Sequence, residues 1–425
     1  MKTQCLCFLI LCLHLSPDRC LPVLAGNLHP LILVPGLGGN QIEASLTGAY
    51  EPTAAACRPR DDGWFRLWLD RSALLDTQSQ ICFAERMRLF YDPEADDYCN
   101  APGVRTRIPL FGSTMGFRYN DPDHKDDWSS YMAPLVERLE AIGYVEGETL
   151  FGAPYDFRYG LASAGHPSRV GSRFLRDLAE LVENASASNG GKPVIILTHS
   201  FGGMLALQLL DRLPATWRKR FVKHFVPLAA PWGGTVLEMG IFATGTNHGL
   251  PFVDNLLMRP ESQSWESNLW LLPSPRTFGE APIVVTNHGN FSASRMSAFL
   301  EGVGFSEGVG PYQSRILPLL QELNPPLIPV TCIAGTGVAT AEVFVYGDGG
   351  FDKLPEIVYG DGDGTVNLVS LLAIESEWFS FPEQDLKVIK LPNISHLDIV
   401  KHDSALSLVI EEILEINDGA LRANS

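Results

Sequence analysis

The chain has 425 residues, enough to bury a large core in one domain with insertions or in two to three domains. Its hydrophobic share of 45% and charged share of 19% are ordinary for a folded protein and argue against disorder. The net charge of −17 argues against a nucleic-acid-binding protein, because phosphate contacts need clustered Lys and Arg. It also opposes adsorption to anionic lipid, so any membrane contact must come from a local apolar patch.

An N-terminal signal peptide is predicted over residues 1–25. Lys2 precedes an apolar run that ends at Leu15, and residues 23–25 form a small-residue pattern suited to cleavage. The run is shorter than the roughly 20 residues that span a bilayer, although a short uncleaved anchor is the alternative. The leader predicts that residues 26–425 enter the secretory pathway. The mature protein would be secreted or lumenal (endoplasmic reticulum to vacuole or apoplast) and peripheral on membranes.

Cysteines and glycosylation sequons are compatible with that compartment. Four cysteines follow the leader and allow three pairings: Cys57, Cys82, Cys99 and Cys332. Asn184 and Asn290 begin Asn-x-Ser sequons and are the predicted glycosylation sites. Each sequon alone is weak evidence, but together with the leader they favour the secretory route.

Apolar runs alternate with helical patterns along most of the chain. Largely apolar runs typical of buried strands lie at 31–34, 194–197, 225–228, 328–333 and 388–391. Apolar residues recur at helical spacing over 174–182 and 204–210. This alternation predicts one α/β domain over 26–425, with a mostly parallel sheet covered by helices on both faces. Two irregular stretches interrupt it and are predicted insertions: a lobe at 49–100 and a cap at 233–325.

A nucleophile elbow is predicted at Ser200. The strand at 194–197 runs directly into Thr198-His199-Ser200-Phe201-Gly202-Gly203, and a leucine-rich helical pattern follows. In such an elbow a sharp turn lifts the serine oxygen clear of the sheet, and small neighbours let strand and helix approach. Thr198 replaces the first glycine of the usual Gly-x-Ser-x-Gly pattern. A serine in an ordinary loop is the alternative, which the flanking strand and helix disfavour.

A nucleophilic serine needs a histidine base oriented by a carboxylate, and in this fold the chain order is serine, acid, histidine. His396 follows the strand at 388–391 by a short loop, a position suited to the base. The glycine-rich loop 360–366 offers Asp361 and Asp363, and residue reasoning leaves the choice open. The loop lacks the glutamate that ends a calcium-binding loop, and no Cys/His cluster has zinc spacing, so neither metal nor cofactor is expected.

These motifs resemble the lecithin–cholesterol acyltransferase family, and especially its plant-type members, over most of the chain after the leader. The matching segments are PLILVPGLGGNQIEA (30–44), WFRLWLD (64–70), NAPGV (100–104), APYDFR (153–158), HSFGG (199–203), APWGG (230–234), DGDGTV (361–366) and HL (396–397). The resemblance implies an α/β-hydrolase fold with Ser200 as nucleophile, Asp363 as acid and His396 as base. It also implies an oxyanion hole formed by the backbone N–H groups of Phe111 and Phe201.

The resemblance further implies a Cys57–Cys82 disulfide that closes a small lipid-facing lobe carrying Trp64 and Trp68. Tryptophan suits a membrane interface, although packing of both rings in a core is the alternative. The usual family partner of Cys332 is missing here. A Cys99–Cys332 bond and two free thiols therefore both remain open.

The activity implied is transfer of an acyl chain from a phospholipid, through acyl-Ser200, to a sterol or other lipid alcohol. Transfer to water, which would make the protein a phospholipase A-type hydrolase, uses the same residues. A non-catalytic lipid-binding protein is a third alternative, and it predicts a decayed triad. The expected partners are a phospholipid membrane or lipoprotein-like surface and the lipid acceptor.

The segment 242–251, in the cap, resembles the family least. Asn393 begins a third sequon beside His396 and is predicted to stay unglycosylated.

Overall fold

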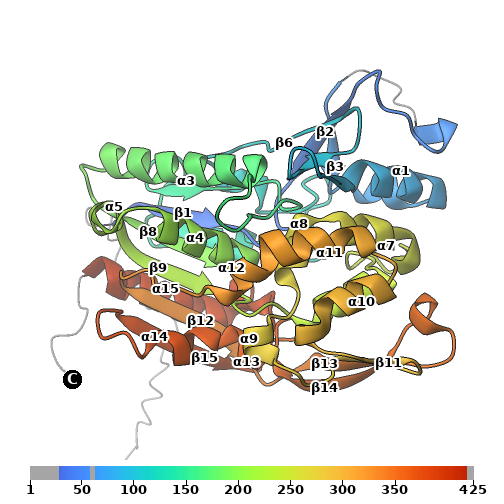
Figure 1. Ribbon diagram of the computed structural model, residues 1–425. Coiled ribbons are helices and arrows are strands. Elements are labelled where there is room, and N and C mark those ends of the chain that lie inside the picture. Colours follow the sequence, from blue (N-terminus) through green and yellow to red (C-terminus); the bar gives the residue numbers. More distant parts are fainter. Residues whose placement is uncertain (1–27, 58–62, 419–425) are drawn as a thin grey trace, which may run out of the picture.

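The structure is a computed structural model that describes residues 28–57 and 63–418; the predicted leader lies outside the described residues. Its centre is a six-stranded sheet in the order β15-β12-β9-β8-β1-β7, in which every neighbouring pair is parallel. The strands are β1 (Leu31–Val34), β7 (Leu150–Gly152), β8 (Val194–His199), β9 (Val222–Leu228), β12 (Val330–Thr336) and β15 (Leu386–Pro392). Figure 1 shows β1, β8, β9, β12 and β15 side by side in this order, from the top of the sheet downward.

The sheet is covered on both faces because its strands are apolar on both sides. In β1, Ile32 and Val34 join one core cluster, whereas Leu31 and Leu33 join the other. The first cluster also holds residues of α3 (Arg169–Ser188) and α4 (Phe201–Arg212). The second holds residues of α2 (Ala133–Ala141) and α15 (Asp403–Asp418). A parallel sheet with helices on both faces and a strand–serine–helix turn at β8 is the α/β-hydrolase fold.

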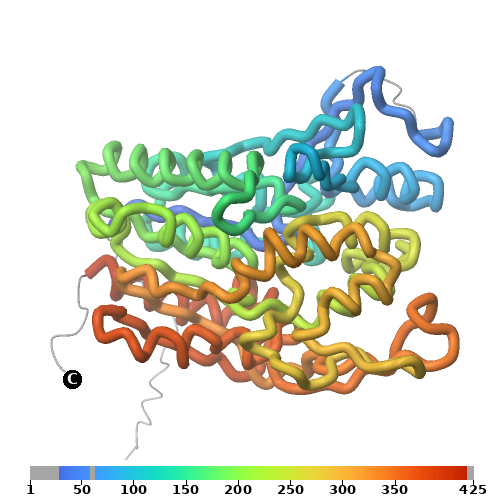
Figure 2. The backbone as a smooth tube through the Cα atoms, in the orientation of Figure 1, coloured from blue at the N-terminus to red at the C-terminus, as the bar shows by residue number. Residues whose placement is uncertain are grey.

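The first insertion forms a lobe that projects from one corner of the molecule, in blue at the upper right of Figure 2. A three-stranded sheet, β3-β2-β6, and the hairpin β4-β5 pack with one helix. Its elements are β2 (Ile42–Leu46), β3 (Phe65–Trp68), α1 (Thr77–Met87), β4 (Leu89–Asp92), β5 (Asp97–Asn100) and β6 (Val104–Arg107).

The second insertion follows β9 and forms a mostly helical cap. Its elements are α6 (Val236–Thr244), α7 (Asn255–Ser264), α8 (Glu266–Leu271), α9 (Pro275–Phe278), β10 (Val284–Thr286), β11 (Gly289–Phe291), α10 (Met296–Gly302), α11 (Val309–Pro311) and α12 (Leu317–Gln321). One strand of this cap, β10, pairs with a strand that follows β12. The sheet β11-β10-β13-β14 includes β13 (Val338–Tyr346) and β14 (Glu356–Gly362).

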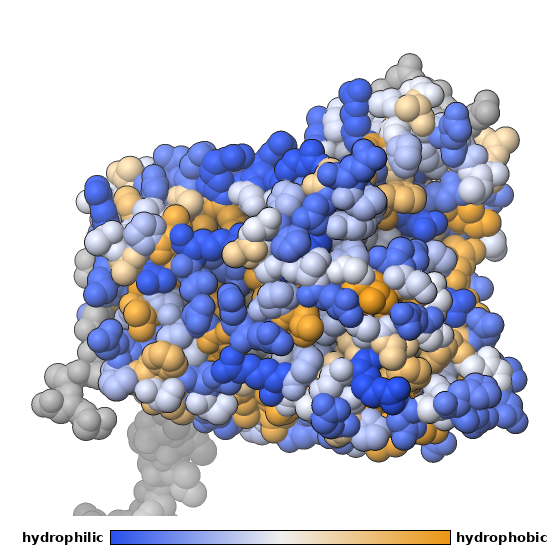
Figure 3. All heavy atoms as spheres, in the orientation of Figure 1, coloured by the Kyte–Doolittle hydropathy of each residue, from blue (hydrophilic) through white to orange (hydrophobic). Residues whose placement is uncertain are grey.

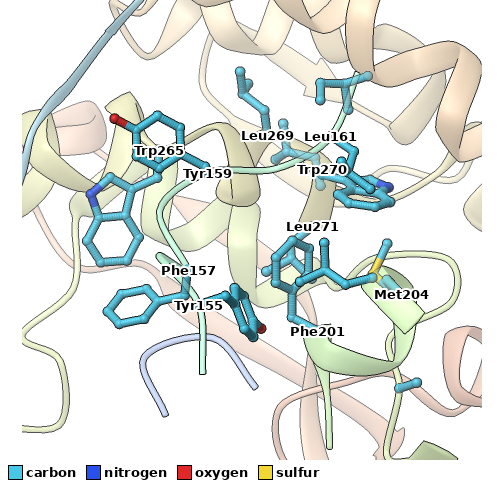
Figure 4. Packing of buried hydrophobic residues seen from close by; sticks show 14 of the residues in the cluster. Tyr155, Phe157, Tyr159, Leu161, Phe201, Met204, Trp265, Leu269, Trp270 and Leu271 are labelled. Carbon is cyan, nitrogen blue, oxygen red and sulfur yellow. The ribbon is translucent and has the colours of Figure 1, made fainter. Parts of the chain in front are cut away.

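Apolar side chains join the cap to the central domain. Trp270 lies 5.3 Å from Phe201 of α4, ring centre to ring centre, and the two rings meet edge to face. Figure 4 shows the two rings together with Leu271 and Met204. The cap therefore packs against the residue that directly follows Ser200.

Candidate active site

Ser200 occupies a sharp turn between β8 and α4. Its backbone has φ 54° and ψ −129°, a conformation that costs a non-glycine residue free energy. The Ser200 N–H donates to the carbonyl of Leu228 in β9 at 2.8 Å, which holds the turn against the sheet. The local structure is therefore a strained nucleophile elbow.

Two glycines after the serine make this turn possible. A Cβ on Gly202 would lie 2.4 Å from the carbonyl oxygen of Pro35, and a Cβ on Gly203 would lie 2.7 Å from the Cβ of Ala230. Both distances are shorter than any normal contact, so only glycine lets α4 approach the sheet here. Thr198, which replaces the usual glycine before the serine, is fully buried in β8.

A continuous hydrogen-bonded chain joins Ser200, His396 and Asp363. The Nε2 atom of His396 lies 2.9 Å from Ser200 Oγ, and its Nδ1 atom lies 2.7 Å from Asp363 Oδ2. The three side chains come from different loops, after β8, β14 and β15. The structure thus brings together the three residues that the sequence assigns to the triad.

Asp363 is held as a carboxylate although it is fully buried. Burial raises its pKa, whereas the charge of His396 and the hydrogen bond to it lower it. The backbone N–H groups of Val366 and Thr365 also donate to Asp363 Oδ1, at 2.7 and 3.0 Å. The net effect lowers the pKa below its ordinary value. Asp361 is exposed and accepts from the Gly337 N–H instead, so Asp363 is the carboxylate that meets His396.

Two further buried residues, Tyr131 and His199, adjoin the triad without contacting Ser200 Oγ through any hydrogen bond given by the structure. The His199 side chain turns away from Ser200 Oγ, as the elbow geometry predicts, but its Nε2 lies 2.8 Å from the main-chain oxygen of His396. Its Nδ1 lies 2.6 Å from the hydroxyl of Tyr131. Burial, and then the charge of His396, lowers the pKa of His199 to about 3. No sequence motif points to Tyr131, and His199 enters only as part of the elbow motif.

Comparisons with known proteins place these residues in a family. A family model described as lecithin:cholesterol acyltransferase matches residues 64–301. The chain is 51% identical to lecithin-cholesterol acyltransferase-like 1 of Arabidopsis thaliana, with 92% of this chain and 91% of that protein covered. The chain belongs to the lecithin:cholesterol acyltransferase family. It is therefore an acyltransferase-type enzyme, with phospholipase activity as the alternative outcome of the same chemistry.

More distant relatives extend over the same length. The human lysosomal phospholipase A and acyltransferase is 34% identical, with 96% of both chains covered. The mouse phosphatidylcholine-sterol acyltransferase is 33% identical, with 94% of this chain and 87% of that protein covered. Among solved structures, the Tle4-Tli4 complex contains a chain with a TM-score of 0.52 and 13% identity, covering 92% of this chain and 98% of that one. This last similarity shows the fold alone.

The two backbone groups expected to form the oxyanion hole lie in different surroundings. Phe201 directly follows the nucleophile and begins α4. Phe111 lies in a turn whose next residue, Gly112, donates to the carbonyl of Gly152 at the end of β7, the edge strand of the sheet. The turn after β1 lies directly against Ser200, because a Cβ on Gly36 would lie 2.8 Å from the Cβ of Ser200. Leu37 follows Gly36 in that turn, so its backbone N–H is a further candidate donor that no sequence motif indicates.

The prediction that Trp68 faces lipid is wrong, because this side chain is buried with 5% of its surface exposed. Its ring packs edge to face against Phe157, Trp265 and His248, with ring centres 5.3, 6.4 and 5.1 Å away. Its indole N–H donates to the Gly38 carbonyl at 2.8 Å. Trp68 therefore ties the lobe to the cap and to the turn after β1, which explains its burial.

Trp64 has the exposure expected of a lipid-facing residue. Its side chain is 42% exposed, and the Arg107 guanidinium lies over its ring. The disulfide Cys57–Cys82 is present and ties α1 to the segment before β3. On the face drawn in Figure 3, apolar side chains are dispersed among polar ones, and the lobe projects at the upper right. Trp64 is thus the one of the two tryptophans that remains available for contact with lipid.

The other cysteines and the sequons have clear positions. Cys99 is exposed in β5 and Cys332 is buried in β12, and both are free thiols, so the open question of their pairing is answered. Asn184 in α3 and Asn290 in β11 are both exposed. Exposure permits glycosylation at both asparagines, which remains a prediction.

Within residues 28–57 and 63–418, no group of three or more His, Cys, Asp or Glu side chains is arranged to hold a metal ion. Across the same residues, none of the helices has both the length and the apolar character required to cross a bilayer.

Proposed function

We propose that the protein is a serine-dependent lipid acyltransferase that moves an acyl chain from a phospholipid, through acyl-Ser200, to a sterol or other lipid alcohol. The observation that supports this proposal is the unbroken chain from Ser200 Oγ through His396 to Asp363. Membership of the family supports the lipid substrate. A lipid-binding protein without activity would have no need to keep all three groups in contact.

In the first half-reaction, His396 Nε2 takes the proton of Ser200 while Oγ attacks the acyl carbonyl carbon of the phospholipid. Asp363 accepts the Nδ1–H of His396, which leaves Nε2 free to act as base and stabilises the imidazolium that forms. The tetrahedral intermediate collapses when the bond to the glycerol oxygen breaks. His396 donates its proton to that oxygen, and lysophospholipid leaves.

In the second half-reaction, His396 takes the proton of the acceptor hydroxyl, and the acceptor oxygen attacks the acyl-Ser200 carbonyl. Collapse of this second intermediate returns the proton to Ser200 Oγ and releases the new ester. The proton that leaves with the glycerol oxygen in the first half-reaction is replaced by the acceptor's proton in the second, so the enzyme returns to its starting state. Acceptors compete only at this step, and the fit and dryness of the site decide between them.

For the oxyanion, we propose that the Phe201 N–H is one donor and that the second comes from Phe111 or from Leu37. Contact of the Gly36 turn with Ser200 favours Leu37, and the family resemblance favours Phe111. Each such donor contributes roughly 10²–10³ in rate. Replacing each residue's backbone amide by an ester, which removes only the N–H, separates the two. The larger loss of kcat identifies the donor.

Water is the competing acceptor and would make the protein a phospholipase A-type hydrolase. The human relative carries both activities in its name and aligns along nearly the whole chain, which keeps this alternative open. Acyl-Ser200 is common to both reactions.

The test uses the secreted protein on phospholipid vesicles that contain sterol and carry a labelled acyl chain. Wild type and Ser200→Ala are compared, with the surface variant Ser376→Ala as matched control. Ser376 is exposed, and its hydroxyl donates to the carbonyl of Ala373 in the same helix, α14 (Ala373–Trp378). Label in steryl ester that depends on Ser200 supports the transferase. Label in free fatty acid alone supports the hydrolase. Label in neither product, and no reaction of Ser200 with a fluorophosphonate, would refute the enzymatic proposal.

We also propose that Trp64 contacts the lipid surface and that the protein acts in the lumen of the secretory pathway or outside the cell. The net charge of −17 makes attraction to anionic lipid unfavourable, so docking should depend on apolar contact. Sedimentation with vesicles should then be unchanged between 0.1 and 1 M salt, because salt screens charges but not apolar contacts. Trp64→Ala should weaken sedimentation, whereas Trp217→Ala on α5 (Ala215–Phe221) should not. Binding that collapses with salt would contradict the apolar mode.

A further inference from the structure

Three buried groups form a hydrogen-bonded chain behind the proposed nucleophile. The N–H of Gly36, in the turn after β1, donates to the Tyr131 hydroxyl at 2.9 Å. That hydroxyl lies 2.6 Å from Nδ1 of His199, and Nε2 of His199 lies 2.8 Å from the main-chain oxygen of His396. Tyr131 and His199 are 4% and 2% exposed, so water does not compete for these bonds.

The direction of every proton in this chain follows from its two ends. The carbonyl oxygen of His396 can only accept, so His199 must carry its hydrogen on Nε2. Neutral His199 then offers a lone pair at Nδ1, to which Tyr131 donates its one hydroxyl hydrogen. The Tyr131 oxygen remains free to accept from Gly36. One tautomer of His199 therefore satisfies all three bonds.

The His396 main chain is held on both sides as a result. Its N–H donates to the Asp363 carbonyl at 2.7 Å, and its C=O accepts from His199. The rings of His199 and His396 also lie 4.8 Å apart, centre to centre. The position of His396 Nε2 over Ser200 thus depends on a contact that is not part of the triad.

At its Gly36 end, the hydrogen-bonded chain holds the turn that lies against Ser200. The Gly39 N–H donates to the Gly36 carbonyl at 3.1 Å, and Gly38 has φ 68°, as the third residue of a type II turn requires. The Tyr131 ring fills the hollow of this turn, because a Cβ on Gly39 would lie 2.5 Å from its Cε1 atom. Tyr131 thus joins the turn after β1 to the residue preceding the nucleophile.

We propose that His199 and Tyr131 are positioning residues that hold His396 and the Gly36 turn in register around Ser200. The inference rests on the proposed function, in which His396 is the base. Neither residue touches the reacting atoms; each acts through the main chain of a residue that does. A displacement of the base of about 1 Å can cost about 10²-fold in rate, so the effect of losing this support is measurable.

The hydrogen-bonded chain from Gly36 to His396 requires a neutral His199, and the surroundings of His199 keep it neutral. The titratable groups that face it are Tyr131, His396 and Asp363. Burial is the largest effect and the charge of His396 the next, and together they lower the pKa of His199 to about 3. Protonation would place a hydrogen on Nδ1 and oppose the Tyr131 hydroxyl. Above pH 4 the chain should therefore persist, including in acidic compartments.

The experiment compares His199→Phe and His199→Gln with wild type on p-nitrophenyl butyrate, a water-soluble ester that avoids the lipid interface. Active sites are counted by complete reaction with a fluorophosphonate, so that kcat is expressed per functional serine. We expect His199→Phe to lower kcat about 10²-fold, with KM changed less than about threefold. His199→Gln, whose amide N–H reaches from Cβ about as far as Nε2, should retain more activity than His199→Phe. If His199 only fills space, the order reverses, because Phe matches its shape better.

The matched control is His224→Phe, because His224 is equally buried, in β9, and its Nε2 lies 2.9 Å from the Thr331 hydroxyl, away from the triad. This variant should lower the melting temperature and leave kcat per site near wild type. If His199→Phe does not fold, Tyr131→Phe removes a single oxygen and should still lower kcat per site about tenfold. When His199→Phe and Tyr131→Phe are combined, the fold-loss of kcat per site should be smaller than the product of the losses in the two single variants.

Full kcat per site in both His199 variants and in Tyr131→Phe, with active wild type, would overturn this inference and leave the proposed function intact. A wild type that neither turns over the ester nor reacts with fluorophosphonate would instead refute the proposed function.

Discussion

Replacing Asp363 by asparagine tests the orientation of His396 directly, because the surroundings of this side chain fix which way an amide must lie. Asp363 Oδ1 accepts two backbone N–H groups, from Thr365 and Val366. An asparagine must keep its oxygen at that position, since its NH₂ group would face two donors there. Its NH₂ group is then directed at His396 Nδ1.

This arrangement forces His396 into the wrong tautomer. Nδ1 must accept from the amide, so the hydrogen moves to Nε2, the atom that lies 2.9 Å from Ser200 Oγ. Nε2 then has no lone pair with which to take the serine proton. In a serine protease the same change lowers kcat about 10⁴-fold, which corresponds to about 5 kcal/mol of barrier, and we expect a loss of that size here.

The assay is hydrolysis of p-nitrophenyl butyrate at pH 7, with sites counted by slow, complete fluorophosphonate labelling. KM should change little, because the substrate does not contact Asp363. Asp361→Asn is the control: Asp361 lies two residues before Asp363, near the end of β14, is exposed and accepts from the Gly337 N–H. Asp363→Asn activity within tenfold of wild type, or an equal loss in Asp361→Asn, would refute the assignment.

Three further predictions follow from packing, burial and chain entropy. Gly36→Ala should lower kcat by about 10²-fold, measured on the same ester, because its Cβ would lie 2.8 Å from that of Ser200. Burial raises the pKa of Glu238 to about 8. As pH rises from 4.5 to 7, the Glu238 carboxyl therefore ionises in the unfolded chain but stays protonated in the folded protein, which destabilises the fold by about 3 kcal/mol. In denaturant unfolding, Glu238→Gln should have a higher free energy of unfolding than wild type at pH 7, and this difference should disappear at pH 4.5. Cys82→Ser should cost about 3 kcal/mol in the same assay, because its bond to Cys57 closes a loop with a sequence separation of 25.

The sequence predicts the central sheet well because its strands are buried on both faces. The run at 31–34 coincides with β1, and the run at 194–197 is the first part of β8. Continuous apolar segments of this length have few other uses in a globular chain. The observed ends differ from the predicted ones where polar residues extend a strand. His199, for example, belongs to β8 although it is not apolar.

Contacts between distant segments were less predictable, because they depend on register and packing that no local pattern encodes. Trp68 is of a residue type that is common at membrane interfaces, but the cap residue Trp265 and the central-domain residue Phe157 enclose it. Tyr131 belongs to no motif. Its role depends on a turn 95 residues away and on a histidine 68 residues away. The serine and histidine of the triad were predictable because the elbow and the histidine after a strand carry local signatures, whereas only the family resemblance chose Asp363 over Asp361.

Asp363 is joined to the cap through a sheet, and this connection limits how the cap can open. Asp363 directly follows β14, which pairs with β13, and β13 pairs in turn with β10 of the cap. A rigid swing of β10 would pull on the strand that carries the triad acid. Opening for an acceptor should therefore occur in the segment 245–254, between α6 and α7, which is not paired in that sheet. Hydrogen exchange measured by mass spectrometry should show fast exchange at 245–254 and slow exchange in β10 and β13; equal rates would contradict a fixed cap sheet.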